Sequence, residues 1–126
     1  MEQFLNYTSP NVYHTPMTSS KYDGYIILTQ PGVATTGRFL GFVAENPSAS
    51  TRWVQVFDGY AKPSDGAVPI ISIKLLTVTQ GSFDAVLMGG LWFTTGCVIA
   101  VSSTGPTYTA VTAGASDGAF VTAFWV

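Results

Sequence analysis

The sequence predicts an all-β protein, a β-sandwich of about eight strands that follows an extended N-terminal arm. From residue 21 onward, short runs rich in Val, Ile, Phe, Tyr, Trp and Thr alternate with clusters of Gly, Pro, Asp and Ser, which is the pattern of strands separated by turns. Helical patterning is almost absent. The length of 126 residues is typical of a single domain with a single core.

The N-terminal arm is expected to span residues 1–20, and the sandwich domain residues 21–126. The arm contains two prolines and six Ser or Thr residues, and it shows neither a helical nor an alternating apolar period. Disordered tails are usually poor in aromatic residues. Phe4, Tyr7 and Tyr13 therefore indicate an arm that lies on its own domain or on a neighbouring chain, with a frayed terminus as the alternative.

Each expected strand is a short run between residues that favour turns, because Gly supplies positive φ and Pro fixes φ, as in Gln30-Pro31-Gly32. The expected strands are Gly24–Thr29, Gly37–Ala44, Arg52–Phe57, Val68–Leu75, Ser82–Leu87, Gly96–Ser102, Thr107–Thr112 and Ala119–Trp125. Jelly-roll and immunoglobulin-like sandwiches share this spacing of strands, so the strand order stays open between them.

Several of these strands are apolar on both faces, notably Val68–Ile73 and Gly96–Val101. One face of a strand in a two-layer sandwich normally meets solvent, so these runs predict a subunit interface or cover by the arm. The C-terminal run is expected to turn one face to the core and the other to an interface. Its two faces are Phe120, Thr122, Phe124 and Val126 on one side, and Val121, Ala123 and Trp125 on the other.

Charged residues make up only 10% of the chain, where about 25% is typical of soluble domains. This deficit predicts that other chains cover part of the surface, unless Ser, Thr, Asn and Gln solvate it instead. The five basic residues are never adjacent, which disfavours nucleic acid and anionic membrane surfaces as partners. The first residues show no secretory signal, and no apolar stretch approaches the length of a membrane span.

The residues that carry most enzyme and metal chemistry are nearly absent, so we expect neither catalytic residues nor a cofactor nor a metal site. His14 is the only histidine and Cys97 the only cysteine, which excludes a tetrahedral zinc site of these ligands. Asp58, Asp65 and Asp117 each precede a glycine, which favours a turn over a calcium site. Glycoside hydrolysis needs a pair of carboxylates, which could come from Glu45, Asp58 and Asp84. Any chain with seven acidic residues offers such pairs, so they do not indicate this activity.

The segments Thr51–Ile70 and Ile99–Thr109 resemble small virion proteins of tailed bacteriophages, namely capsid decoration (cement) proteins or other head-surface proteins. The similar region covers roughly residues 38–126 and carries no catalytic motif, so the resemblance assigns no role to any residue. It implies a β-sandwich that packs on the capsid surface of the virion, forms a homotrimer, and reinforces contacts between capsomers. The major capsid protein or other virion proteins would be its partners, and the host cytoplasm its place of synthesis.

Two functions follow from these observations. In the first, the chain is a structural virion protein and no enzyme; its expected interface residues are Phe4, Leu5, Tyr7 and Tyr13 of the arm and Phe124, Trp125 and Val126 at the C-terminus. In the alternative, the chain is a receptor- or glycan-binding module of a phage tail or fibre. Exposed aromatic residues on turns would then contact sugar, with Trp92, Tyr60 and Tyr108 as the candidates.

Overall fold

The computed structural model describes residues 11–17, 25–27, 37–85, 89–111 and 119–125, and within these ranges the protein is all-β and has no helix. Nine strands form two antiparallel sheets, one more strand than the sequence predicts. The strands are β1 (Asn11–Met17), β2 (Tyr25–Ile27), β3 (Gly37–Asn46), β4 (Arg52–Asp58), β5 (Ile71–Leu75), β6 (Thr79–Asp84), β7 (Leu91–Phe93), β8 (Cys97–Ser102) and β9 (Ala119–Trp125).

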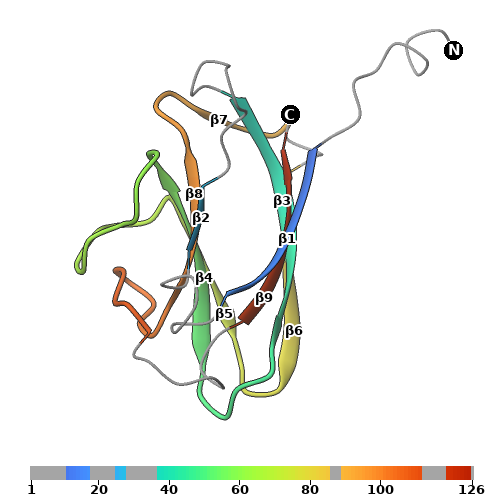
Figure 1. Cartoon of the computed structure of the whole chain (residues 1–126), viewed down its shortest axis with the longest axis vertical. Coiled ribbons are helices and arrows are strands. Elements are labelled where there is room, and N and C mark those ends of the chain that lie inside the picture. The colour runs from blue at the N-terminus through green and yellow to red at the C-terminus, as the bar shows by residue number, and fades with distance from the viewer. Residues whose placement is uncertain (1–10, 18–24, 28–36, 86–88, 112–118, 126) are drawn as a thin grey trace, which may run out of the picture.

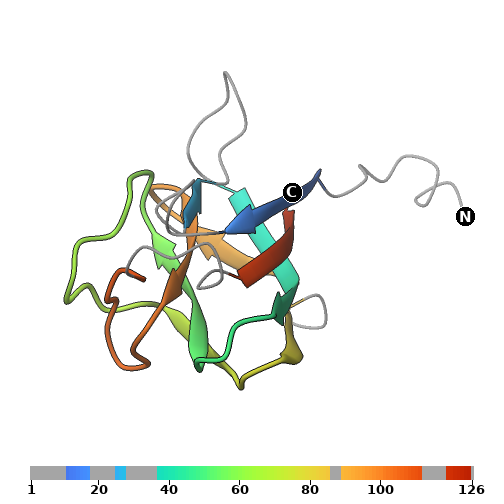
Figure 2. The same cartoon turned by 60° about the horizontal axis from the view of Figure 1, so that its bottom comes forward.

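The two sheets face each other, as Figures 1 and 2 show. Sheet A has the order β1-β9-β3-β6, with the short β7 also paired to β3, and sheet B has the order β2-β8-β4-β5. The pairings are nested along the chain: β4 pairs with β5, β3 with β6, β2 with β8, and β1 with β9. The chain therefore forms a long antiparallel ribbon that is folded over into two layers.

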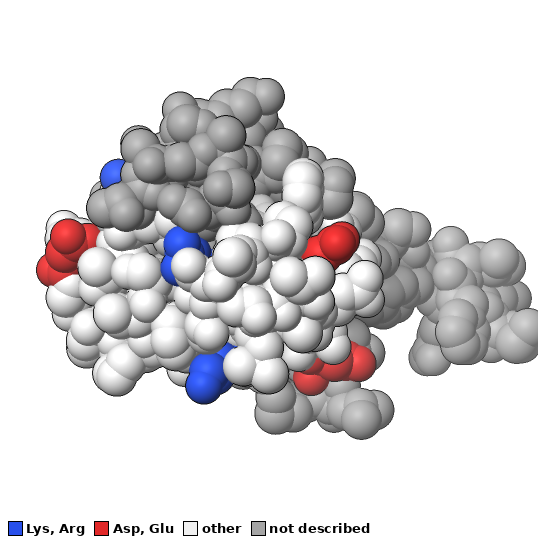
Figure 3. Space-filling model, turned by 90° about the horizontal axis from the view of Figure 1, so that it is seen from below, with Lys and Arg blue, Asp and Glu red and all other residues white. Residues whose placement is uncertain are grey.

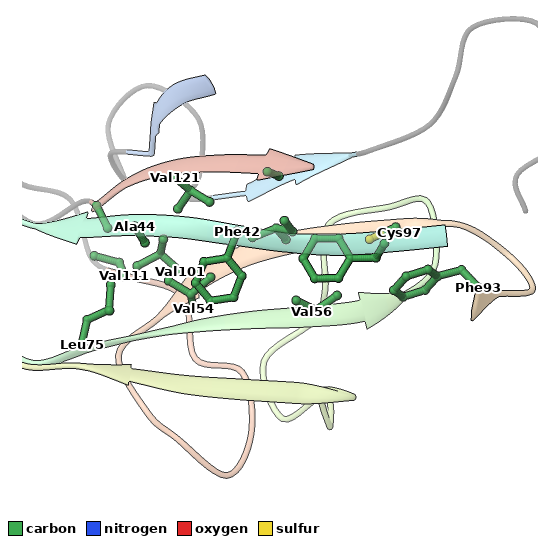
Figure 4. Close-up of a cluster of buried hydrophobic side chains, with 14 residues drawn as sticks. Phe42, Ala44, Val54, Val56, Leu75, Phe93, Cys97, Val101, Val111 and Val121 are labelled. Carbon is green, nitrogen blue, oxygen red and sulfur yellow. The ribbon is translucent and has the colours of Figure 1, made fainter. Parts of the chain in front are cut away.

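The core lies between the sheets because alternate side chains of each strand point inward. Sheet B contributes Val54, Val56, Ile99 and Val101 to it. The phenylalanines of sheet A form its aromatic part, where the Phe39 ring lies 6.2 to 6.5 Å from the rings of Phe42, Phe83 and Phe93. Figure 4 shows buried side chains from both layers meeting in one cluster, among them Phe42, Phe93, Val54, Val56 and Val101.

A bulge in β3 explains why Phe39 and Phe42 both point inward although they are an odd number of residues apart. The pairing with β9 shifts its register between Phe39 and Gly41. Gly41 has a φ of +148°, a conformation that residues with a side chain rarely adopt. A Cβ atom at this position would also collide with the carbonyl oxygen of Phe83 on the neighbouring strand. Glycine is therefore required at the bulge.

The expected strand Ala119–Trp125 is confirmed with its bounds, and three others are confirmed within two residues at either end, namely Gly37–Ala44, Arg52–Phe57 and Gly96–Ser102. The expected strand Gly24–Thr29 is described only at residues 25–27, where it is β2.

Two expected strands begin elsewhere, and one is missing. The run Val68–Leu75 becomes a strand only at Ile71, after Pro69, which lacks an N–H for a ladder. The run Ser82–Leu87 is shifted, since β6 starts at Thr79. Residues 107–111 form no strand and make only an isolated bridge between Ala110 and Ser102.

Two strands were not expected as strands. One is β7, which is three residues long. The other is β1, whose residues 11–17 belong to the predicted arm and pair with β9 over their full length. This part of the arm lies on its own domain, one of the two positions that its aromatic content allowed. Residues 1–10 lie outside the described residues.

The two-sided apolar strand β8 is covered by its own chain, so the expectation of a subunit interface or of cover by the arm is wrong here. Every residue of β8 is buried. Val98 and Ala100 on its outer side pack against Phe57 and Tyr108. Tyr108 is held there by a backbone hydrogen bond from its N–H to the carbonyl oxygen of Ala67, with a length of 2.8 Å.

The run Val68–Ile73 is not buried on both faces either. Ile71 and Ile73 pack against the core, whereas Val68 and Ile70 are exposed. Ser72 between the two inward residues is exposed as well, so the strand alternates in the ordinary way.

Candidate protein-binding surface

The outer face of sheet B is closed by two loops, residues 59–70 and 103–111, which lie on that side of the molecule in Figure 1. Gln55 on β4 is fully buried beneath the second loop. Its Nε2 donates hydrogen bonds to the carbonyl oxygens of Thr104 at 3.0 Å and Gly105 at 2.9 Å. A Cβ at Gly105 would clash with the Trp53 indole, which shows how closely the loop approaches the sheet.

The outer face of sheet A, in contrast, is crossed by no described segment in either view (Figures 1 and 2). Its strands β6, β3 and β9 present three cross-strand rows of side chains. These rows are Asp84–Gly41–Phe124, Ser82–Val43–Thr122 and Gln80–Glu45–Phe120. Val43 is 50% exposed and Phe120 39% exposed, so apolar surface meets solvent at the centre of a β-sheet. Because larger exposed apolar patches mark interaction sites, we take this face as the candidate binding surface.

Two shallow grooves run along this face and meet at Val43 and Ser82. The Phe124 groove, with a volume of about 310 Å³, is lined by Leu40, Gly41, Val43 and Phe124 among others. The Phe120 groove, of about 440 Å³, is lined by Val43, Phe120 and Thr122 together with polar residues. Because Gly41 has no side chain, the floor of the Phe124 groove stays open between its flanking rows.

Trp92 extends the same face at the β7 end of sheet A. It pairs with Arg38 across the strands, and both side chains point outward because their neighbours Phe39 and Phe93 point into the core. The guanidinium carbon of Arg38 lies 5.4 Å from the centre of the indole, and Arg38 Nη1 donates to the carbonyl oxygen of Gly89 at 3.0 Å. Trp92 is 72% exposed, which confirms its predicted exposure.

A second exposed apolar feature is the turn between β5 and β6, at the lower end of the molecule in Figure 1. Leu76 and Val78 are both exposed there. We call these two side chains the apolar tip. Figure 3, a view from below, shows that the charged side chains of the described residues form separate small patches on this side, with uncharged surface of described residues between them.

The turn aspartates that the structure describes stabilise loops. The carboxylate of Asp58 accepts hydrogen bonds from the N–H groups of Thr95 at 2.9 Å and Gly96 at 3.2 Å, and from the Thr94 hydroxyl at 2.8 Å. These bonds, first of all the one from Thr95, lower the pKa of Asp58. Asp65 accepts a hydrogen bond from the N–H of Ala110 at 3.0 Å. Asp117 lies outside the described residues.

No group of three His, Cys, Asp or Glu side chains that could hold a metal ion occurs within residues 11–17, 25–27, 37–85, 89–111 and 119–125. The candidate carboxylates Glu45 and Asp84 lie on sheet A, whereas Asp58 ends a strand of sheet B. Cys97 points into the core, and burial raises the pKa of its thiol. The reactive thiolate form is therefore disfavoured.

The structure separates the predicted C-terminal interface residues. Phe124 lines a groove on the outer face of sheet A, whereas Trp125 packs against the core from the opposite face of β9. Tyr13 is part of β1, where its backbone pairs with Ala123. The remaining predicted interface residues, Phe4, Leu5, Tyr7 and Val126, lie outside the described residues.

Among the predicted sugar-contacting residues, Trp92 and Tyr60 are exposed and Tyr108 is fully buried. The prediction for Tyr108 is therefore wrong, because this ring covers the outer side of β8. The sequence analysis missed Val43 and the apolar tip. The alternation of inward and outward residues in β3 shows that Val43 points outward only when the bulge at Gly41 is taken into account.

No helix in the described part of the chain is long and apolar enough to cross a membrane. Comparison with protein-family models, with curated protein sequences and with solved structures gave no significant match. The resemblance to phage virion proteins therefore stays a prediction.

Proposed function

We propose that the chain is a non-enzymatic structural protein of a phage virion, a capsid decoration (cement) protein that packs on the head surface and reinforces contacts between capsomers. The single observation that carries the proposal is the difference between the two sheets. Sheet B is closed by loops of its own chain, whereas sheet A leaves Val43, Phe120 and Phe124 on an open face. A protein that works by covering other proteins needs such a face.

We further infer that the two facing sheets form a jelly-roll β-sandwich, in preference to an immunoglobulin-like one. The nested pairing of β4 with β5, β3 with β6, β2 with β8 and β1 with β9 supports this topology, because a jelly roll is a ribbon of antiparallel pairs folded into two sheets. Double-sheet jelly rolls occur in both viral capsid and lectin domains. The fold is thus compatible with either function and decides neither.

The low charge of the chain also supports a role in an assembly. With 10% charged residues, the protein exposes mostly uncharged surface. Burying apolar area contributes about 25 cal/mol per Å², and the same contact repeated around a symmetric ring or lattice adds avidity. A small domain without catalytic groups can reinforce a shell by this means alone.

The proposal is tested on heads assembled with and without the purified chain. Omission of the chain should lower the temperature at which the heads open, and the added chain should cosediment with the heads. Val43→Arg places a charge in the centre of the open face and should abolish cosedimentation. Val68→Arg, at an exposed valine on the loop side of sheet B, is the matched control and should leave it intact. Heads of equal stability with and without the chain would refute the proposal.

The alternative, a receptor- or glycan-binding module of a tail or fibre, is favoured by Trp92. An exposed indole beside the Arg38 guanidinium resembles the aromatic platforms on which sugars stack. A glycan that quenches the fluorescence of the wild-type chain and not that of Trp92→Ala would support this function. Tyr60→Ala serves as the control for exposure of an aromatic residue elsewhere on the surface.

A further inference from the structure

Four strands lie at the ends of the two sheets in the described part of the chain, namely β1 and β6 in sheet A and β2 and β5 in sheet B. The edge of a sheet carries backbone N–H and C=O groups that no neighbouring strand pairs, and a strand of another chain can pair with them. Proteins commonly protect such edges with short strands, with proline, with lysine or with a bulge. The four edges of this protein differ in that protection.

β6 is the edge without these devices. β2 is three residues long where it is described, β1 contains Pro16, and β5 contains Lys74. β6 is six residues long, contains neither proline nor lysine, and pairs with β3 in continuous register over its whole length. Gln80 and Ser82 on this strand are exposed. Of the four edges, β6 is therefore the one most open to another strand.

The backbone N–H and C=O groups of Gln80 and Ser82 point away from β3. The N–H of Ala85 donates to the carbonyl oxygen of Leu40 at 2.8 Å, and successive residues of an antiparallel strand turn these groups alternately to either side. Phe83 therefore bonds to β3 as Ala85 does, whereas Ser82 and Gln80 turn their groups to the open side. Within the described residues, nothing bonds to these outward groups of Gln80 and Ser82.

From this edge we propose that β6 of one copy pairs with β6 of a second copy, antiparallel and about a two-fold axis at Gly81. Sheet A then continues from one copy into the next. In this register Gln80 lies opposite Ser82 of the second copy and Ser82 opposite its Gln80, so the outward N–H and C=O groups of both residues are all paired. Phe83 comes opposite Thr79, an aromatic and β-branched pair of the kind that stabilises adjacent strands.

A second copy fits this edge better than an unstructured peptide does. Its β6 is already ordered as a strand by pairing with β3, so association costs little backbone conformational entropy. The register also places no two like charges opposite one another, because Asp84 lies opposite Val78 of the second copy. The same surface is used on both copies, so the contact closes as a dimer.

The pairing goes beyond the proposed function and does not rest on it. It uses the backbone at the edge of sheet A, whereas the contact with the phage head uses the outer face around Val43. A two-fold contact gives a dimer, where the resemblance to virion proteins implies a homotrimer. The mass of the chain in solution therefore distinguishes the two.

Light scattering of the full-length chain across a dilution series measures the association. The wild type should be a dimer that dissociates to the monomer on dilution. Ser82→Pro removes an outward N–H and breaks no bond to β3, so it should stay monomeric at concentrations about tenfold or more above those at which the wild type dimerises. Ser82→Ala keeps the N–H and, as the matched control, should dimerise like the wild type. A Ser82→Pro chain that dimerises equally well, or a trimeric wild type, would overturn the inference.

Amide hydrogen exchange tests the same contact on the wild type, without a substitution that could disturb folding. The N–H groups of Gln80 and Ser82 should exchange about tenfold or more slowly in the dimer than in the dilute monomer, because only the dimer pairs them. The N–H groups of Gly81 and Phe83, which the alternation directs to β3, should be protected in both and serve as the internal control. Equal exchange of Gln80 and Ser82 in concentrated and dilute protein would refute the pairing.

The two proposals fail in different ways. If the wild type is monomeric throughout the dilution series but binds and stabilises heads, the edge pairing is refuted and the decoration function stands. If it dimerises through β6 but neither binds nor stabilises heads, the edge pairing stands and the decoration function is refuted. Val43→Arg should lose cosedimentation with heads and keep the dimer, because it changes the outer face and leaves the edge intact.

Discussion

Replacement of Gly41 by alanine isolates the cost of the bulge that keeps both Phe39 and Phe42 in the core. Two terms contribute to it. The φ of +148° is unfavourable for alanine, and the new Cβ would collide with the carbonyl oxygen of Phe83 on the paired strand. The backbone term is about 1–2 kcal/mol, and local displacement of the strand adds about 1–2 kcal/mol. Gly41→Ala should therefore destabilise the protein by about 2–4 kcal/mol.

Two other glycines separate these terms. Gly66 has a φ of +91° and a Cβ there would meet nothing within 4 Å, so Gly66→Ala should show the backbone term alone, about 1–2 kcal/mol. Gly59 has neither a positive φ nor a neighbour within 4 Å, so Gly59→Ala should be within about 0.5 kcal/mol of the wild type.

Urea unfolding followed by tryptophan fluorescence measures all three variants. For a domain of this size, each kcal/mol corresponds to about 3–5 °C in the thermal midpoint. If Gly41→Ala costs no more than Gly66→Ala, the close approach of Phe83 has no energetic weight. If it costs no more than Gly59→Ala, the account of the bulge is wrong altogether.

Three further predictions use the same unfolding assay. Asn46→Ala should cost about 2–4 kcal/mol, because the buried Asn46 Nδ2 donates to the carbonyl oxygens of Leu75 at 3.2 Å and Leu76 at 3.1 Å and both bonds would be lost, although the Leu76 oxygen keeps its bond from the Thr79 hydroxyl; a loss below about 1 kcal/mol would contradict this reasoning. Because the pKa of Asp58 is lowered in the folded state, its contribution to stability is complete above the unfolded pKa of about 3.9 and is lost as the pH falls through the folded pKa. Asp58→Asn should therefore flatten the decline of stability below about pH 4. An unchanged pH profile would exclude Asp58 as the source of that decline. Tyr108→Ala should cost about 3–5 kcal/mol, since this fully buried ring covers β8 and meets the Phe57 ring edge-on, with the ring centres 6.0 Å apart. An unchanged free energy of unfolding would mean that the loop of residues 103–111 does not stabilise β8.

The class of the fold followed from local patterns. Runs of β-branched and aromatic residues between Gly, Pro and Asp clusters are short-range signals, and they located β9 with its bounds and β3, β4 and β8 to within two residues. The alternation along β9 also divided its residues correctly into two faces, because side chains in a strand point alternately to either side. Alternation alone did not show which face of β9 packs against the core. In the structure this is the face that carries Trp125.

The candidate surface depended on contacts between residues far apart in the chain. The apolar sequence of β8 is the same whether a partner chain or a loop of its own chain covers its outer side. Only the fold shows that Tyr108 of its own chain covers that side. Val43 became an outward residue only through the bulge at Gly41, which reverses the alternation within β3. The sequence therefore determined that the protein is a small, weakly charged all-β domain, since composition and local period decide that. The tertiary structure alone decided which sheet is closed and which stays open, because burial of a strand face depends on whatever packs against it from elsewhere in the chain.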